Sequence, residues 1–264
     1  MIRKLAALLA GAALLLGAGA VRAQTVDDII KKGTLTVAID TTTPPYAMLG
    51  TEMQPQGFDI DLANLIAKTL GVKIEFVTVN SPGRIPALLT NRVDIVVSIF
   101  SITAERAEQV WFSIPYAGQC SALLGPKDHV AHSLKDLEGK KVAVTRGAAE
   151  DTIISAYSKE HGDSIQILRF DDYPSTTSAM LSGQVDFVGG GDYGDIYFRK
   201  TGAGQEMEMK FTLKCFHFGI GMRRGQVDLK QWLNTFIYTV KNDGTLDALS
   251  QKWRKAPLPS LPVF

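Results

Sequence analysis

The chain has 264 residues, and its 28 lysines and arginines stand against 27 aspartates and glutamates, for a formal net charge of +1. This near balance gives no large excess of positive charge, so nucleic acid is not an expected partner. A chain of this length can form one large domain or two lobes of ordinary size.

The first 23 residues have the pattern of a secretory signal peptide, with a basic start at Met1–Lys4, an apolar run over Leu5–Ala20 and small residues for cleavage at Val21–Ala23. The apolar run has 16 residues, fewer than the roughly 20 that a membrane-spanning helix needs. No cysteine follows it to carry a lipid anchor. We therefore expect a signal peptide over residues 1–23 and a soluble periplasmic protein that is not a lipoprotein. Its removal takes three of the 28 basic residues, leaving 25 against 27 acidic ones.

Beyond the signal peptide, short β-branched runs alternate with amphipathic segments. The runs expected to form strands are Leu35–Ile39, Val72–Val77, Val93–Ser98, Lys141–Thr145, Ile165–Leu168 and Val185–Val188. Between the first two, a helix is expected to start with Asp59 as its cap and to end at Gly71. This alternation predicts an α/β fold.

The tract after the third strand is the most informative part of the sequence. Ser98 ends the strand, Thr103 is a suitable N-cap, and Arg106 lies in the helix expected to follow. Unpaired N–H groups at the start of such a helix, near the carboxyl end of a strand, favour an anion. Arg106 adds a two-pronged donor suited to a carboxylate, although an arginine at this spacing is also common as a surface ion pair.

Two segments of the chain resemble each other, residues 89–96 (LTNRVDIV) and 181–188 (LSGQVDFV). Each follows a similar strand, at Val37–Ile39 and Val142–Val144 respectively. Two similar halves indicate two lobes with a cleft between them. The alternative is that both segments are alike only as strands.

Several short strings stand in a fixed order along the chain. They are Gly57–Ala63, Arg84–Leu89, Val93–Ile95, Ser101–Arg106, Phe112–Tyr116, Leu137–Val144, Gly219–Gly225 and Asp243–Leu246. Taken together, they resemble the extracytoplasmic solute-binding proteins of polar amino-acid ABC importers, bacterial solute-binding protein family 3. The resemblance covers nearly all of the chain after the signal peptide, and it does not identify the ligand.

This resemblance implies an α/β fold with the two-lobed architecture of type II periplasmic binding proteins. Lobe one would comprise residues 25–117 and 219–264, lobe two residues 118–218, and two crossing strands would form the hinge. A small molecule, expected to be an amino acid, would bind between the lobes of a monomer. Hinge closure would enclose it, and an inner-membrane ABC permease would receive it. No cofactor and no metal are implied.

The resemblance also implies particular ligand contacts. In relatives, the residues aligned with Ile99 and Ser101 contact the ligand's amine and carboxylate, and the arginine aligned with Arg106 clamps the carboxylate. The turn Gly147–Ala149, followed by a helix, would offer N–H groups to the same carboxylate. The residues expected to contact the ligand are Asp40, Thr43, Tyr46, Ser98, Ile99, Phe100, Ser101, Arg106, Gly147, Ala148, Ala149 and Asp192.

Two positions depart from the family's apolar pattern, so the sequence does not identify the ligand. Thr43 aligns with the aromatic residue that covers the ligand in relatives, and Ser81 aligns with a second apolar wall position. Tyr46 and Phe100 would either replace part of this cover or pack in the core.

A third departure concerns the ligand's ammonium group. Gly191 aligns with the acidic residue that holds the ammonium in relatives. Asp192 could take over if the run Gly189–Gly191 bulges, and Asp40, which follows the first strand, is the second candidate. An ammonium enclosed in a cleft needs such a partner, because a desolvated, unpaired charge is costly.

Other functions receive less support from the sequence. A dehydratase on the same scaffold, like the cyclohexadienyl dehydratases, would need a general acid or base in the cleft, for which Glu150 is a candidate. The same cleft could also take a small organic acid or serve a sensory receptor. Gly189, Gly191 and Gly194 match a dinucleotide pattern without the long helix that it requires, and His129 and His132 lack a third metal ligand.

Two cysteines in an exported chain suggest one disulfide bond. With the lobe boundaries implied above, Cys120 lies just after the first crossing of the hinge and Cys215 just before the second. On antiparallel strands they would face each other within disulfide range. The alternative is a pair of buried thiols.

Overall fold

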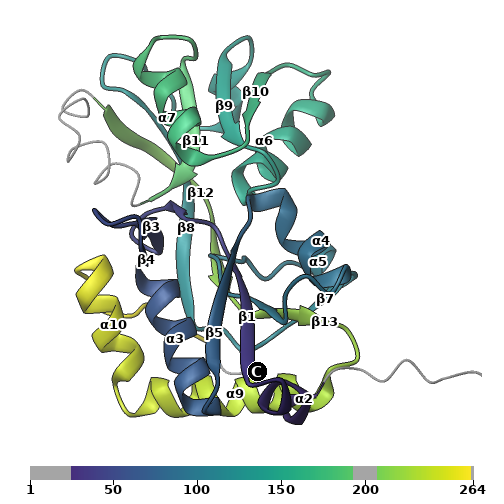
Figure 1. Ribbon diagram of the computed structural model, residues 1–264. Coiled ribbons are helices and arrows are strands. Elements are labelled where there is room, and N and C mark those ends of the chain that lie inside the picture. The colour runs from purple at the N-terminus through teal and green to yellow at the C-terminus, as the bar shows by residue number, and fades with distance from the viewer. Residues whose placement is uncertain (1–24, 193–206, 263–264) are drawn as a thin grey trace, which may run out of the picture.

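The computed structural model describes residues 25–192 and 207–262, which form two α/β lobes joined by a pair of long strands (Figure 1). Each lobe is built on its own five-stranded sheet. The predicted signal peptide at residues 1–23 lies outside the described residues. Within the described residues, no helix is both long enough and apolar enough to cross a membrane.

Lobe one, the lower body in Figure 1, has the strand order β5-β1-β6-β13-β7. Its strands are β1 (Thr34–Ile39), β5 (Lys73–Thr78), β6 (Ile95–Val96), β7 (Val110–Phe112) and β13 (Gly221–Arg223). Strands β5, β1 and β6 are parallel, and β13 is antiparallel to both β6 and β7. The carboxyl ends of the three parallel strands therefore point the same way, toward lobe two (Figure 1).

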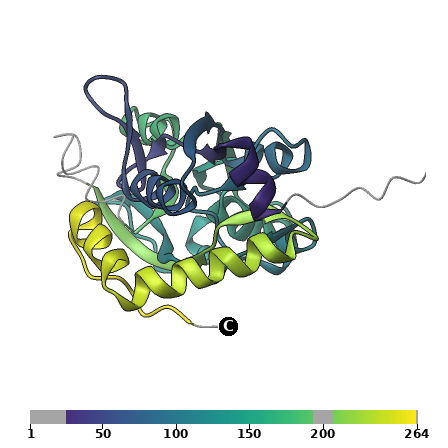
Figure 2. The ribbon, with the colours of Figure 1, turned by 60° about the horizontal axis from the view of Figure 1, so that its bottom comes forward.

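Helices cover both faces of this sheet. They are α2 (Val26–Lys32), α3 (Phe58–Leu70), α4 (Arg84–Leu89), α5 (Ala104–Ala107), α9 (Val227–Asn242) and α10 (Thr245–Arg254). The larger core lies under α3 and α9, which bury Leu62, Ile66 and Ile237 completely. Figure 2 shows α9 stretched across the underside of the lobe. A small sheet of β2 (Thr42–Thr43), β3 (Ala47–Leu49) and β4 (Pro55–Gln56) and a 3₁₀ turn, η2 (Ser81–Gly83), complete the lobe.

The start of α3 differs from the prediction. Its N-cap is Gly57, at a φ of 138°, and no side chain caps the helix. Glycine is required there, because a Cβ would lie 2.6 Å from the carbonyl carbon of Tyr46. Asp59 does not cap the helix, because its buried carboxylate accepts a hydrogen bond from the Ile99 N–H instead. The helix ends as predicted at Gly71, which adopts the left-handed conformation of a C-cap.

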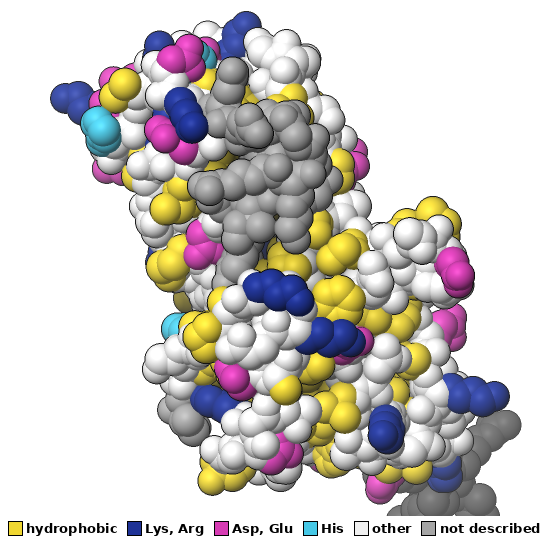
Figure 3. Space-filling view, turned by 90° about the vertical axis from the view of Figure 1, so that its left-hand side faces the viewer, with side chains coloured by type: hydrophobic (Ala, Val, Ile, Leu, Met, Phe, Trp, Pro, Cys, Tyr) yellow, Lys and Arg dark blue, Asp and Glu magenta, His cyan; other side chains and the backbone are white. Residues whose placement is uncertain are grey.

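Lobe two, the upper body in Figure 1, has the strand order β10-β9-β11-β8-β12. Its elements are β8 (Ala117–Pro126), η3 (Leu134–Leu137), β9 (Lys141–Thr145), α6 (Ala149–Glu160), β10 (Gln166–Phe170), α7 (Tyr173–Leu181), β11 (Phe187–Gly191) and β12 (Met207–Phe218). Its separate core includes Leu123, Val142 and Phe187. The space-filling view shows the two lobes as distinct masses (Figure 3).

Strands β8 and β12 connect the lobes. They are antiparallel, with Ala117 opposite Phe218 at the lobe-one end and Pro126 opposite Met207 at the far end. The lobe boundaries implied by the sequence, 117/118 and 218/219, fall at the lobe-one end of this pair. Cys120 lies directly opposite Cys215, and a disulfide bond joins them, which confirms the predicted bridge.

Replacing both cysteines by serine is expected to lower the free energy of unfolding by about 2–5 kcal/mol, because the bridge shortens the unfolded chain across a separation of 95 residues. Urea denaturation of the wild-type protein and of Cys120→Ser/Cys215→Ser measures the loss. Reduced wild-type protein is the control and should match the double variant. Two reactive thiols in denatured, unreduced wild-type protein would contradict the bridge.

Candidate functional site

A cavity lies between the lobes and takes its walls from both. Lobe one contributes Asp40, Thr42, Thr43, Pro44, Tyr46, Ser81, Arg84, Ile99, Ser101 and Arg106, and lobe two with the hinge strands contributes Gln119, Ser121, Thr145, Ala148, Ala149, Glu150, Tyr173, Gly191, Phe216 and Phe218. Of the predicted contact residues, eight line the cavity: Asp40, Thr43, Tyr46, Ile99, Ser101, Arg106, Ala148 and Ala149. Ser98, Phe100, Gly147 and Asp192 do not line it.

Arg106 connects the two lobes. The Thr103 side chain caps α5 by accepting from the Arg106 N–H, as predicted, although α5 is only a four-residue turn. The guanidinium donates to the carbonyl oxygens of Ser101 at 2.9 Å and Gly147 at 3.0 Å, the latter in lobe two. Burial, together with the charge of nearby Arg84, lowers the pKa of Arg106 to about 10. Arg106 therefore remains a cation at neutral pH.

Arg84 is a second cavity cation, which the sequence analysis did not assign to the site. It is 3% exposed at the first residue of α4, and it donates to the Ser81 hydroxyl at 2.5 Å. Its Nε has no hydrogen-bond partner in the structure. Burial lowers the pKa of Arg84. The sequence could have indicated Arg84 by its position shortly after β5, because the carboxyl ends of the parallel strands lie beside the cavity.

Phe100 packs against both arginines and is not among the residues that line the cavity. The guanidinium carbon of Arg106 lies 5.2 Å from the centre of the Phe100 ring, and that of Arg84 lies 5.8 Å from it. The ring is 1% exposed and packs against Phe112. Of the two roles considered for Phe100, core packing is the one observed, and cation–π attraction adds to it.

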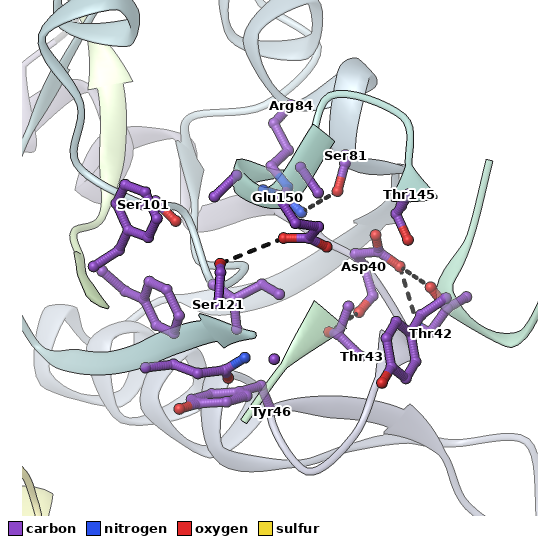
Figure 4. A pocket seen from close by; sticks show the side chains of 18 of the residues that line it. Asp40, Thr42, Thr43, Tyr46, Ser81, Arg84, Ser101, Ser121, Thr145 and Glu150 are labelled. Carbon is purple, nitrogen blue, oxygen red and sulfur yellow. Dashed lines mark hydrogen bonds between the residues drawn. The ribbon is translucent and has the colours of Figure 1, made fainter. Parts of the chain in front are cut away.

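Asp40 supplies a buried carboxylate to the cavity, and one of its two oxygens accepts no hydrogen bond from the described residues. It follows β1 and is 2% exposed. Its Oδ1 accepts from the Thr42 N–H at 3.1 Å and from the Thr42 hydroxyl at 2.6 Å (Figure 4). Among residues 25–192 and 207–262, no group donates a hydrogen bond to its Oδ2. Ser98 does not reach the cavity, because its hydroxyl accepts from the Asp40 N–H at 3.0 Å. A buried, unpaired carboxylate oxygen is costly, so this position suits a cationic ligand group.

The turn before α6 offers fewer donors than predicted. The Gly147 N–H donates to Asp151 at 3.0 Å, and the Ala148 N–H donates to the Thr145 carbonyl at 3.1 Å. Gly147 instead presents its carbonyl to Arg106. Ala149 is the first residue of α6, which no side chain of the described residues caps, and an N–H at this position has no partner within its own helix.

Glu150 is the second carboxylate of the cavity. It is 8% exposed in the first turn of α6, and it accepts from the Ser121 hydroxyl at 3.5 Å (Figure 4). Burial raises the pKa of Glu150, and the charges of Arg84 and Arg106 oppose that rise. The cavity walls thus carry two guanidiniums and two carboxylates.

Ile99 reaches the cavity in an unfavourable backbone conformation. Its φ is 37°, a value that a β-branched residue rarely adopts. The Ile99 N–H donates to the buried Asp59 carboxylate at 2.8 Å, and the Tyr116 hydroxyl donates to the other Asp59 oxygen at 3.0 Å. Burial raises the pKa of Asp59 to about 7 despite these hydrogen bonds. Asp59 therefore anchors the turn that carries Ile99 and Ser101.

The aromatic side of the cavity comes from Tyr46 and two residues of β12. The Tyr46 ring packs edge-on against Phe58 and Phe218, so its position is fixed by the lobe-one core. Thr43 lines the cavity, and its hydroxyl donates to the Asp40 carbonyl at 2.9 Å. Phe216 and Phe218, which the sequence analysis did not identify, supply further apolar wall.

Asp192 lies outside the cavity because the expected bulge is absent. Strand β11 pairs regularly with β8 from Val188 opposite Leu124 to Gly191 opposite Ser121. The Asp192 N–H donates to the Cys120 carbonyl at 2.9 Å, and its carboxylate accepts from the Cys120 N–H at 3.3 Å. Asp192 thus holds the end of β11 to the hinge, and Gly191 takes the place beside the cavity.

Comparison with known proteins identifies the family. Residues 35–256 match the family model described as bacterial extracellular solute-binding proteins, family 3. That match covers more than half of the chain, so the chain belongs to this family. The predicted two-lobed fold of type II is confirmed by the solved structures that resemble it.

Three similar proteins illustrate the range of this family. The L-cystine-binding protein TcyJ of Escherichia coli K12 is 27% identical over 237 residues, covering 86% of this chain and 85% of its own. A mutant of ArgBP from T. maritima has a TM-score of 0.81 at 30% identity, covering 88% of this chain and 99% of its own. The ancestral amino acid-binding protein AncCDT-1, a precursor of cyclohexadienyl dehydratase, has a TM-score of 0.78 at 34% identity, covering 86% and 98%.

The raised pKa of Asp59 predicts how stability depends on pH. In the folded protein the pKa is about 7, against an ordinary value of 3.8. Between these values the native state binds the proton more strongly, so this contribution is fully present below pH 4 and is lost as pH rises toward 7. We expect the free energy of unfolding to fall by up to about 1.4 kcal/mol per pH unit in this window through Asp59. Urea denaturation at pH 4.5 and 7 measures the fall.

The matched variant is Asp59→Asn, which cannot titrate and should remove this part of the pH dependence. Asp61→Asn is the control, because Asp61 is on the same helix but pairs with Lys252 at the surface. Parallel stability curves for wild type and Asp59→Asn would contradict the raised pKa.

Proposed function

We propose that this protein is the substrate-binding component of an ABC importer, which captures an amino acid between its lobes and delivers it to a membrane permease. The observation that carries the proposal is the pairing of charges in the cavity. The guanidiniums of buried Arg84 and half-buried Arg106 face the space that also contains the Oδ2 of Asp40, which accepts no hydrogen bond from the described residues. The similar proteins TcyJ and AncCDT-1 are named for binding amino acids, which supports the same ligand class here.

An amino acid complements these charges at both of its ionised groups. Its carboxylate would fit between the Arg106 guanidinium, the cavity-lining residue Ser101 and the Ala149 N–H at the start of α6. Its ammonium fits the Asp40 carboxylate, which lacks one hydrogen bond. Since the ligand would bring one charge of each sign, it leaves the overall charge balance of the cavity unchanged.

Closure of the hinge would complete the site. In the structure Arg106 already donates to the Gly147 carbonyl of lobe two, so the lobes meet across the cavity mouth. A ligand bound first to lobe one would gain Ala149 and Ser121 when the hinge strands β8 and β12 bend. The permease would then distinguish the closed form from the open one.

The cellular setting follows from the same proposal. Export through the signal peptide at residues 1–23 would place a monomer in the periplasm, next to its inner-membrane permease. Calorimetric titration of protein that has been unfolded and refolded to remove carried-over ligand, against the twenty standard L-amino acids, L-cystine and small organic acids, tests the function directly. Saturable binding of an amino acid supports it, and binding of organic acids alone would overturn it.

A dehydratase activity is the second candidate, because buried Glu150 lies in the cavity with a raised pKa and AncCDT-1 is a precursor of such an enzyme. A protonated carboxyl group in a closed cleft can act as a general acid. Incubation with prephenate or arogenate separates the candidates: product formation indicates turnover, and its absence with saturable amino-acid binding indicates capture.

Arg106→Ala is expected to weaken amino-acid binding at least a hundredfold while the protein stays folded. Removing one partner of a buried ion pair costs about 3–5 kcal/mol. Arg106→Lys should restore little, because an ammonium lacks the two-pronged geometry of the guanidinium. Calorimetry gives the affinities and circular dichroism the fold. Arg146→Ala is the control, since Arg146 pairs with Asp171 at the surface. Near-normal affinity in folded Arg106→Ala protein would refute the carboxylate clamp.

Asp40→Asn is expected to weaken binding of an amino acid by about 1.5–3 kcal/mol, the range for a hydrogen bond to a charged group. It should barely change binding of a ligand that lacks the amine. Asp192→Asn is the matched variant and should bind as wild type does, because Asp192 lies outside the cavity. A loss in Asp192→Asn alone would reverse the assignment. If only Arg106→Ala mattered, the cleft would recognise a carboxylate without an amine.

A further inference from the structure

The hinge strand β8 directs a carboxamide into the cavity. Gln119 and Ser121 line the cavity, and Cys120 between them forms the disulfide bond. Because successive side chains of a strand point to opposite faces, the two cavity residues share one face of β8. In the neighbouring strand β11, Gly191 lies opposite Ser121, so a side chain at position 191 would project from this same face of the sheet.

Gly191 leaves room for the Gln119 side chain. A Cβ built on Gly191 would lie 2.6 Å from the Gln119 Cδ and would overlap the amide nitrogen outright. The backbone at Gly191 does not itself need glycine, because it is not among the residues with positive φ. A side chain at 191 and the present position of the Gln119 amide therefore exclude each other, and the amide, at the end of a flexible side chain, would have to move.

We propose that Gln119 is a ligand-contacting residue of the hinge, and that Gly191 is its obligatory partner, which keeps the carboxamide in the cavity. The proposal rests on the proposed function and adds the residue pair that sets the chemistry of this wall. A carboxamide both donates and accepts a hydrogen bond, so it meets a polar ligand group without adding charge.

The charge balance of the cavity favours such a neutral contact. The cavity-lining side chains carry two guanidiniums, on Arg84 and Arg106, and two carboxylates, on Asp40 and Glu150. A further carboxylate at position 119 would leave a negative charge uncompensated inside a desolvated cleft, which is unfavourable. Gln119 is followed by Cys120, whose N–H donates to the Asp192 carboxylate and whose carbonyl accepts from the Asp192 N–H. These two hydrogen bonds fix the backbone next to Gln119 at the hinge.

A double-mutant cycle tests the pair. Gln119→Ala, Gly191→Ala and the double variant are titrated by calorimetry with whichever of the twenty standard L-amino acids or L-cystine binds the wild-type protein most tightly. Gln119→Ala should weaken binding about three- to tenfold, the effect of one neutral hydrogen bond. Gly191→Ala should cause a similar loss, because its methyl group displaces the amide. In the Gln119→Ala background, Gly191→Ala should cost nothing further. Gln184→Ala, on the exposed surface of lobe two, is the control for the glutamine change.

Each outcome bears on a different claim. Wild-type binding with no effect of Gln119→Ala overturns the ligand contact. An equal loss from Gly191→Ala with and without Gln119 overturns the pairing, since the methyl group would then act through something else. Failure of the wild-type protein to bind any of these amino acids overturns the proposed function together with this inference.

Gln119→Glu tests the neutral character of the contact, since it keeps the shape of the side chain and adds a charge. Binding of the same amino acid is expected to weaken at least tenfold at pH 8. Unchanged or tighter binding would show that the ligand places a cation against this wall, and would overturn the neutral contact.

Discussion

The placement of two like charges against one phenylalanine ring is the constraint on which the site depends. The guanidinium carbons of buried Arg84 and half-buried Arg106 lie 5.8 Å and 5.2 Å from the Phe100 ring centre, and burial lowers the pKa of each arginine. Such groups persist only where opposite charge and hydrogen-bond acceptors surround them. Ser81, two carbonyl oxygens and the carboxylates of Asp40 and Glu150 meet that need in part. The carboxylate of the proposed amino-acid ligand would add a further opposite charge beside the arginines.

A chain of contacts carries this constraint from the core of lobe one to the cavity. Asp59 in α3 holds the Ile99 N–H, and Tyr116 holds Asp59, so a buried carboxyl group supports the strained turn that carries Ser101. Arg106 in turn donates to the Ser101 carbonyl. The cavity-lining residues Ile99 and Ser101 are thus positioned by Asp59 and Tyr116, which do not line the cavity themselves.

The sequence predicted most of the expected strands, the hinge and the disulfide well, because each depends on local pattern or on pairing of long strands. The strand expected over Val93–Ser98 was wrong in length, since β6 comprises only Ile95–Val96. The sequence predicted Arg106 and Asp40 for the same reason, since both follow strands whose carboxyl ends meet at the cleft. It missed Arg84 and Gln119, because whether a polar side chain faces a cavity depends on packing that no single string reveals. The bulge expected in Gly189–Gly191 did not form, because the pairing of β11 with β8 continues unbroken to Gly191 and uses those backbone groups.

The hinge also makes lobe two a module. The chain enters it at Ala117 and leaves it at Phe218, two residues that lie opposite each other on paired strands, and the disulfide bond fastens the strands just beyond. Because the two connections to lobe one lie so close together, lobe two can be replaced by another lobe with a different sequence and different loops. The positions of the two connections in lobe one would not change. Half of a binding site can be exchanged in this way while the other half, with its arginines and Asp40, is inherited intact.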